Sequence, residues 1–247
     1  MTVQEIRSQF PALAQQVYGK PLVYLDNAAT AQRPTAVLEK EHALASTANA
    51  NIHRAVHKLA VDATEEYERT RDIVRDFLNA GSREEIVFTS GTTMSINLVA
   101  SCFGEAFVGE GDEIIVSVAE HHSNIVPWQL LCQRKKAVLK VLEIDEFGGL
   151  MVDSLEKLIS QRTKIIAISH ISNVLGLVNP VREIVRIAHG HDIPVLVDGA
   201  QGSVHHEVDV QELDCDFYAF SGHKVYGATG TGVLYGKNRL SSASQSR

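Results

Sequence analysis

Three side chains that could do chemistry stand within four residues of each other in the segment AFSGHKVYG, residues 219–227. They are Ser221, His223 and Lys224, and they directly follow a short apolar run. A lysine among buried groups can act as an amine nucleophile toward a carbonyl, and the hydroxyl and imidazole can donate to a phosphate. The alternative is an exposed surface lysine, which is the fate of most lysines.

A carboxylate follows a second apolar run, in the segment VDGAQ, where Asp198 precedes Gln201 by three residues. In open α/β sheets, ligands gather at the carboxyl ends of the strands. A partly desolvated carboxylate at that edge favours a cationic partner. A helix N-cap is the alternative interpretation of Asp198.

The segment FTSGTTMSIN, residues 88–97, has the pattern of a strand, a glycine turn and a helix start. Thr92 and Thr93 follow the glycine. A helix N-terminus offers free N–H groups and a positive dipole end, so this is a phosphate-binding arrangement. Taken alone, the segment is more typical of an ordinary threonine N-cap, because such caps are common in every fold.

Polar residues also follow two further apolar runs. They are His121, in the segment AEHHSN, and Asn173, in the segment HISNVLG. Adjacent histidines on a loop give no ligand pair at helical spacing, so we expect no metal site. The His121 ring could instead stack on a flat cofactor. Together with an amine, a carboxylate and a phosphate cradle, these residues suit pyridoxal phosphate, which needs a lysine for its aldehyde and an acid for its pyridine nitrogen.

Seven short β-branched runs must position these side chains, and most of them are continuously apolar. Such runs are typical of strands covered on both faces, as in a parallel sheet. With helical patterns between them, they predict an α/β fold: a mostly parallel seven-stranded sheet with helices on both faces. The last two runs leave no room for a helix and predict an antiparallel hairpin. The runs span residues 86–90, 113–118, 139–144, 163–169, 194–199, 217–220 and 232–236.

The helical patterns between these runs are amphipathic. The clearest runs from about residue 62 to residue 78, and Asp62 with Glu65 could form a capping box at its start. A second follows the Gly-Thr-Thr turn, with Cys102 on its inward stripe. A third covers residues 181–189.

Composition limits the class of protein. The 247 residues carry a net charge of −7, with 45% hydrophobic and 21% charged residues. This mild acidity argues against nucleic acid or an anionic membrane surface as a partner. We find no apolar stretch of membrane-spanning length and no signal-peptide pattern, so we expect a cytoplasmic protein. Three scattered cysteines exclude a disulfide framework.

Several long motifs occur in order and resemble the cysteine desulfurases of the SufS/CsdA group, within the class V aminotransferase-like enzymes of fold type I. They are YLDNAAT, NIHRAVH, GTTMSINLVA, GDEIIVSVAEHHSNIVPW, VDGAQG and DFYAFSGHKVYGATGTGVLYG, and the likeness runs from about residue 5 to residue 240. The resemblance implies an N-terminal helical segment (1–20) and a pyridoxal-phosphate-binding large domain (21–240). The polar end (241–247) looks like a disordered or aberrant tail.

The resemblance also implies roles for individual residues. Lys224 would hold the cofactor covalently, Asp198 would pair with the pyridine nitrogen, and His121 would stack on the ring and move a proton. Gln201 and Asn173 would contact the side of the ring that carries the phenolic oxygen. The phosphate would be held by Thr93, Ser221 and His223, with Thr92 close by, and a loop at the substrate entrance would carry His53 and Arg54.

Such an enzyme would take L-cysteine, or L-selenocysteine, release L-alanine and pass sulfur to a SufE-type acceptor for iron–sulfur cluster assembly. It would work as a homodimer. Members of the group are roughly 400 residues long, and their nucleophilic cysteine and carboxylate-binding arginine lie in the C-terminal part. We therefore expect this chain to be truncated and inactive, with Cys102, Cys132 and Cys215 as buried thiols. Met94 and Ala228 are small departures from Glu and Pro.

Two alternatives stay open from the sequence. The chain could be a non-catalytic cofactor-binding fragment that pairs with a full-length subunit. It could also be another fold-type I aminotransferase or lyase, because the cofactor residues serve a shared part of the mechanism.

Overall fold

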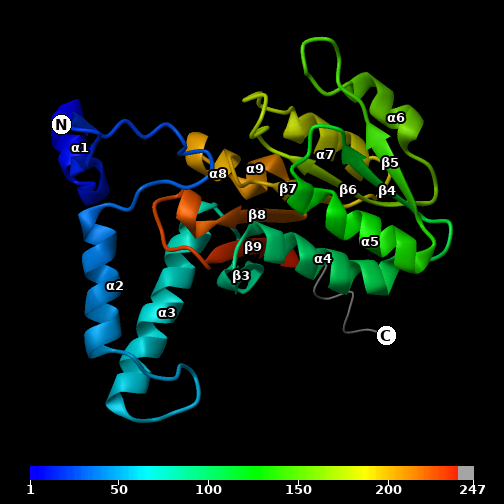
Figure 1. Cartoon of the computed structure of the whole chain (residues 1–247). Coiled ribbons are helices and arrows are strands. Elements are labelled where there is room, and N and C mark those ends of the chain that lie inside the picture. The colour runs from blue at the N-terminus through cyan, green and yellow to red at the C-terminus, as the bar shows by residue number, and fades with distance from the viewer. Residues whose placement is uncertain (239–247) are drawn as a thin grey trace.

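A seven-stranded sheet forms the centre of the protein, seen in a computed structural model that describes residues 1–238 (Figure 1). Its strand order is β3-β9-β8-β7-β6-β4-β5, and β9 alone runs antiparallel to its neighbours. The mostly parallel sheet and the final hairpin are thus confirmed. The strands are β3 (Ile86–Thr89), β4 (Glu113–Ser117), β5 (Val138–Leu142), β6 (Thr163–Ser169), β7 (Val195–Asp198), β8 (Phe217–Ser221) and β9 (Gly232–Gly236).

Helices cover both faces of this sheet, as expected. On one face lie α4 (Thr92–Phe107) and α5 (Val126–Lys135); on the other lie α6 (Leu155–Leu158), α7 (Val181–His189) and α9 (Val210–Leu213). Alternation along β6 divides the core between the faces. Ile165 and Ala167 pack with α4 and α5, and Ile166 and Ile168 pack with α6 and α7.

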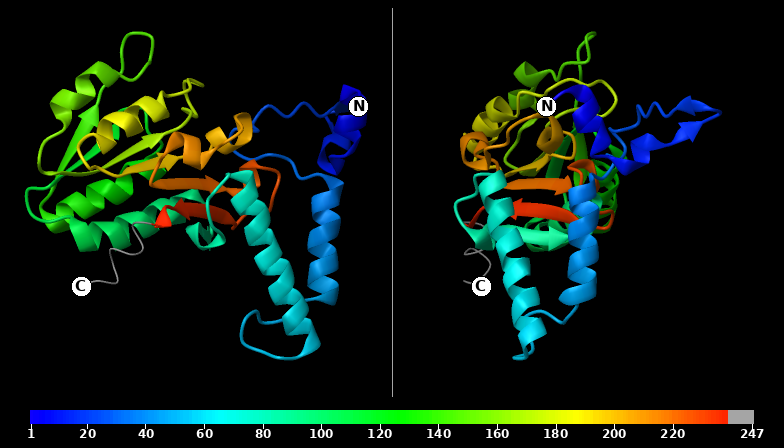
Figure 2. Two further views of the ribbon diagram at one scale, coloured as in Figure 1. Left: turned by 180° about the vertical axis from the view of Figure 1, so that it is seen from behind. Right: turned by 90° about the vertical axis from the view of Figure 1, so that its left-hand side faces the viewer.

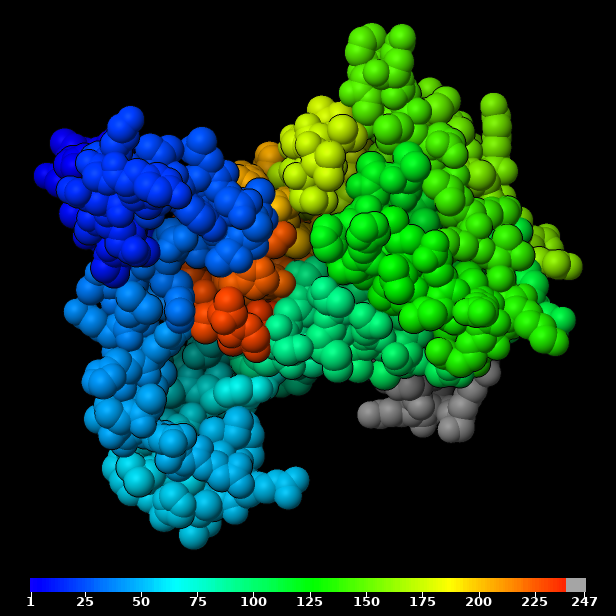
Figure 3. Space-filling view, in the orientation of Figure 1, coloured from blue at the N-terminus to red at the C-terminus, as the bar shows by residue number. Residues whose placement is uncertain are grey.

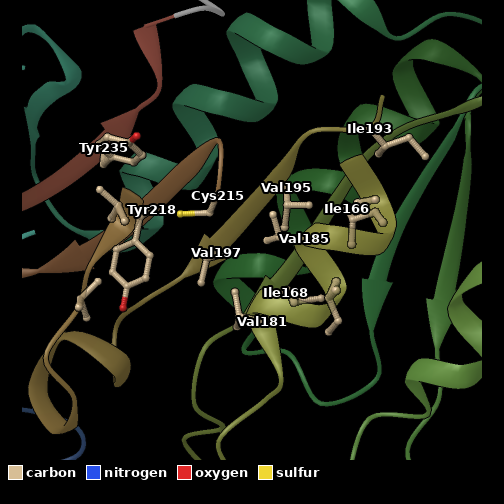
Figure 4. Packing of buried hydrophobic residues seen from close by; sticks show 14 of the residues in the cluster. Ile166, Ile168, Val181, Val185, Ile193, Val195, Val197, Cys215, Tyr218 and Tyr235 are labelled. Atoms are coloured by element: carbon tan, nitrogen blue, oxygen red, sulfur yellow. The ribbon is translucent and has the colours of Figure 1, made fainter. Parts of the chain in front are cut away.

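Buried residues of β7 and β8 form a core next to the polar residues Asp198 and Ser221 that end these two strands. Figure 4 shows Val197, Cys215 and Tyr218 among the isoleucines and valines of β6, β7 and α7. Tyr218 is fully buried, and its hydroxyl hydrogen-bonds to Nδ1 of His170 at 3.0 Å. The aromatic ring therefore satisfies its one polar atom while it fills the core.

Helix α3 (Lys58–Phe77) starts four residues before the predicted position. The predicted capping box of Asp62 and Glu65 is wrong, because the His57 ring caps the helix by accepting from the Ala60 N–H. The helix at α7 has the predicted bounds, 181–189.

The predicted burial of Cys102 is also wrong, because this residue is exposed. The buried stripe of α4 includes Ile96, Val99 and Ala100. Cys102 lies three residues beyond Val99, about 60° around the helix axis, and lines an open hollow with Phe217 of β8 and Leu234 of β9, so it is exposed at the margin of the buried stripe. Cys132 and Cys215 are buried, as expected.

The N-terminal part lies beside the sheet and projects from it. Helices α2 (Thr35–Thr47) and α3 run side by side away from the sheet (Figures 1 and 2). No residue of α2 is buried, and Ala60 alone is buried in α3. In Figure 3 the blue N-terminal segment borders the orange and red surface near the end of the chain. The Ala31 N–H donates to the His223 carbonyl there at 3.0 Å.

The predicted N-terminal helical segment is helical only in part, since residues 16–21 form a small hairpin. The predicted tail, 241–247, lies outside the described residues. Within residues 1–238, no helix has the length and apolarity to cross a bilayer. The remaining elements are α1 (Val3–Ser8), η1 (Pro11–Ala14), β1 (Gln16–Val17), β2 (Lys20–Pro21), η2 (Arg83–Glu85), η3 (His122–Asn124), η4 (Val152–Ser154), α8 (Gly202–His205) and η5 (Gly222–Lys224).

Candidate cofactor site

A cavity of about 460 Å³ opens at the carboxyl edge of the sheet, and this volume suits a small cofactor. The segments that follow β3, β4, β6, β7 and β8 all reach it, because the carboxyl ends of parallel strands meet at one edge. Every predicted cofactor residue lines it: Thr92, Thr93, His121, Asn173, Asp198, Gln201, Ser221, His223 and Lys224.

One end of the cavity has the features of an anion site. The Ser221 hydroxyl oxygen accepts from the Thr92 N–H at 2.8 Å and lies 2.7 Å from the Thr92 hydroxyl. Gly91, at φ 148°, lets the chain turn from β3 into α4. A Cβ on Gly232 would stand 2.3 Å from the Gly91 Cα, so only glycine permits this approach. The N-terminus of α4 thus meets β8 at a point fit for a phosphate.

Asp198 supplies a buried carboxylate at the end of β7. Its Oδ1 accepts from the Ala200 N–H at 3.0 Å, and its backbone pairs with Ser169 and Ala219 on the neighbouring strands. Burial raises the pKa of Asp198; the Ala200 N–H, Lys224 and His121 act in the opposite direction. A desolvated carboxylate of this kind favours a cationic partner in the cavity, such as a protonated pyridine nitrogen.

Lys224 supplies an amine at the end of η5, three residues after β8. Burial lowers its pKa, and the charge of Asp198 partly opposes this shift. The unprotonated amine, which is the nucleophilic form, is therefore more populated at a given pH than in a surface lysine. Burial, and then the charge of Lys224, lowers the pKa of His223 as well.

Among the remaining predicted residues, His121 and Gln201 line the sides of the cavity and are held by hydrogen bonds. Nδ1 of His121 lies 2.8 Å from the Ser123 hydroxyl and accepts from the Ser123 N–H at 3.1 Å. Nε2 of Gln201 donates to the Ala28 carbonyl at 2.8 Å. The donor set therefore has what pyridoxal phosphate requires: an anion cradle, an acid, an amine and a ring-sized aromatic side chain.

Sequence reasoning missed the contribution of the N-terminal segment. Asp26, Ala28 and Ala29 line the cavity although they precede β3 by about sixty residues. They belong to the YLDNAAT motif, which was noted for its resemblance and given no role. Ser123 and Ser169 also line the cavity. No local pattern distinguishes them from ordinary turn serines.

His53 and Arg54 are not brought to the cavity. His53 lies in the loop before α3, where its N–H donates to the Thr64 hydroxyl at 3.0 Å. Its ring makes an edge contact with Tyr67, and its Nε2 lies 3.3 Å from Glu68. A role for these residues at a substrate entrance would need a second chain, and it remains a prediction.

The three cysteines also lie outside the cavity lining. Cys102 faces solvent on α4. Burial raises the pKa of Cys132 to about 11 and raises that of Cys215 further. None of the three therefore lies where it could attack a group bound in this cavity.

The sheet order and the side chains at its edge define the cofactor-binding domain of a fold-type I, pyridoxal-phosphate-dependent protein. The profile of the class-V aminotransferases matches residues 23–246, and the chain belongs to this family.

Relatives and solved structures agree with this family. A probable cysteine desulfurase of Halalkalibacterium halodurans is 54% identical over 96% of this chain and 58% of its own. The cysteine desulfurase CsdA of Escherichia coli is similar in structure, with a TM-score of 0.86, 46% identity and coverage of 97% of this chain and 59% of its own. The apo cysteine desulfurase of Thermococcus onnurineus NA1 has a TM-score of 0.90 at 39% identity, with coverage of 97% and 58%. The chain thus spans a little under three fifths of these relatives.

Proposed function

We propose that this chain is the cofactor-binding part, residues 21–240, of a cytoplasmic cysteine desulfurase. The observation that supports it most is the convergence of Asp198, Lys224 and the Thr92–Ser221 cradle on one cavity. The relatives named cysteine desulfurase supply the reaction. Sulfur would leave L-cysteine, with L-alanine as the other product, and L-selenocysteine is the analogous substrate.

The residues of the chain would divide the work. Pyridoxal phosphate, when bound, withdraws electrons from the substrate Cα and so makes its proton easier to remove. Asp198 would keep the pyridine nitrogen protonated, and Lys224 would hold the aldehyde and then take up the Cα proton on its Nζ. His121 would lie against the ring and move a proton at Nε2, since its Nδ1 is engaged by Ser123.

Transfer of sulfur needs a cysteine nucleophile, and the placement of the three cysteines favours a second candidate function. In this candidate the chain binds the cofactor without turning over by itself. Measuring the release of alanine and persulfide from cysteine distinguishes an active desulfurase from a chain that only binds the cofactor. We expect release close to background, and robust turnover would contradict the second candidate.

The exposed projection is consistent with assembly as a homodimer. Val56, in the loop between α2 and α3, is 99% exposed, and Ile73, on α3, is 61% exposed. A second copy could cover these apolar side chains and bring its own His53 and Arg54 to the cavity entrance. A SufE-type protein is the proposed sulfur acceptor.

The cofactor assignment is tested by spectroscopy of the purified chain with pyridoxal phosphate. We expect a visible absorption band from the covalent attachment to Lys224, and Lys224→Ala should abolish it. Lys237→Ala is the matched control, because Lys237 pairs with Asp214 away from the cavity. A chain without the band, or a band that survives Lys224→Ala, would refute the assignment.

A further inference from the structure

A buried carboxylate with no role so far lies beneath the cavity. Glu120 follows β4, immediately precedes His121 and is 8% exposed. Within residues 1–238, no lysine, arginine or histidine forms an ion pair with it. A buried carboxylate without a cation is costly, so its hydrogen bonds must account for it.

Four donors from three residues converge on the two oxygens of this carboxylate, the longest bond being that of the Ser169 hydroxyl to Oε1 at 3.4 Å. Oε1 of Glu120 accepts from the Ser117 hydroxyl at 2.5 Å and from the Ser169 N–H at 3.0 Å. Oε2 accepts from Nδ2 of Asn124 at 2.8 Å. These donors belong to the end of β4, the end of β6 and the turn before α5, so one side chain ties three elements together.

The direction of these bonds is fixed by a tryptophan. Nε1 of Trp128 donates to Oδ1 of Asn124 at 3.0 Å. An indole nitrogen can only donate, so the Asn124 amide cannot turn around, and its NH₂ group must face Glu120. Both oxygens of Glu120 therefore act as acceptors. A glutamine at position 120 would set its NH₂ group against another donor.

This network holds two walls of the cavity. His121 and Asn124 begin and end one short turn, and the Asn124 N–H donates to the His121 carbonyl at 2.8 Å. The His121 ring bonds to Ser123 in the same turn, so ring and turn move as one unit. Glu120 fastens that unit to Ser169, which lines the cavity.

We propose that Glu120 is a positioning residue, which fixes the His121 ring over the cavity by supplying acceptors that a neutral amide cannot supply. The effect on cofactor binding rests on the function proposed above; the network itself does not. Burial raises the pKa of Glu120 to about 7, the hydrogen bonds oppose this shift, and the charge of Asp198 on β7 adds to it. The hydrogen-bond partners of Glu120, which are Ser117, Asn124 and Ser169, are all neutral.

The first test uses the cofactor-free chain. Trp128 is the only tryptophan, so its fluorescence reports on this network. In the unsubstituted chain we expect an emission change with a midpoint near pH 7, and Glu120→Gln should remove it. Glu113→Gln, at the other end of β4, should leave it in place. A transition that survives Glu120→Gln, or one that Glu113→Gln removes, would overturn the proposal.

The second test titrates pyridoxal phosphate and follows the visible circular dichroism of the bound cofactor. We expect Glu120→Gln to weaken binding about tenfold, the effect of orphaning one buried donor. Adding Asn124→Asp restores the pattern of donors and acceptors at the same net charge, and it should restore binding. If the single variant fails to fold, folding itself becomes the measurement. Recovery of folding in the double variant then supports the proposal, and failure to recover refutes it. Wild-type binding in Glu120→Gln, or no recovery, refutes the proposal.

The two proposals fail separately. If the unsubstituted chain shows no cofactor band, the proposed function fails, and the fluorescence titration still decides the role of the network around Glu120.

Discussion

The close approach of two glycines gives the sharpest prediction about the anion end of the cavity. Gly232 lies on β9 between Thr89 of β3 and Ser221 of β8, beside the turn that begins α4. In Gly232→Ala the new Cβ would stand 2.3 Å from the Cα of Gly91 and 2.5 Å from its nitrogen. Ordinary contacts need about 3.5 Å, so the two backbones must separate by about 1 Å.

This separation has two measurable costs. Overpacking against backbone should lower the free energy of unfolding by about 1–3 kcal/mol. The shift also moves the first turn of α4 away from Ser221. We expect the loss of at least one charge-assisted hydrogen bond to the phosphate, and hence binding of pyridoxal phosphate about tenfold to a hundredfold weaker. Urea denaturation and cofactor titration measure the two effects.

Gly236→Ala is the matched control on the same face of β9. Its Cβ would meet the Phe217 ring at 3.6 Å, an ordinary contact. The same change of residue should therefore be neutral, or stabilising by roughly 0.5–1 kcal/mol. Equal unfolding free energies and equal cofactor affinities for the two variants would refute the reasoning about the approach of Gly232 to Gly91.

Two further predictions concern titration and thiol access. Because burial lowers the pKa of Lys224 and Asp198 opposes this, covalent capture of pyridoxal phosphate should rise with pH at a midpoint below that of an ordinary lysine. Asp198→Asn should move the midpoint to still lower pH, and a shift upward would contradict the assigned coupling. In the native chain a thiol reagent should modify Cys102 alone, with the two buried cysteines reacting only after denaturation. Mass spectrometry after labelling checks this, and rapid modification of three thiols would be inconsistent with the core packing.

The chemistry of the site could be predicted from the sequence because the contributing residues lie at the end of a strand or in the segment that follows it. A run of apolar residues marks a strand locally, and parallel strands place their carboxyl ends at one edge. Asp198, Lys224 and the Thr92 turn could therefore be placed together without knowledge of any contact between them. The sequence, together with the family that it resembles, thus predicted the fold class, the cavity edge and the nine residues that line the cavity.

Only the tertiary structure decided features that depend on contacts distant in the chain. Gln201 reaches Ala28, 173 residues away, and so brings the N-terminal segment to the cavity. The acceptor role of Glu120 depends on Ser169, 49 residues away. Cys102 is exposed although it lies at the margin of an apolar stripe, because a position on such a stripe does not say whether another element covers it. Periodicity is a property of a segment, whereas burial and hydrogen-bond direction belong to the partner that packs against it.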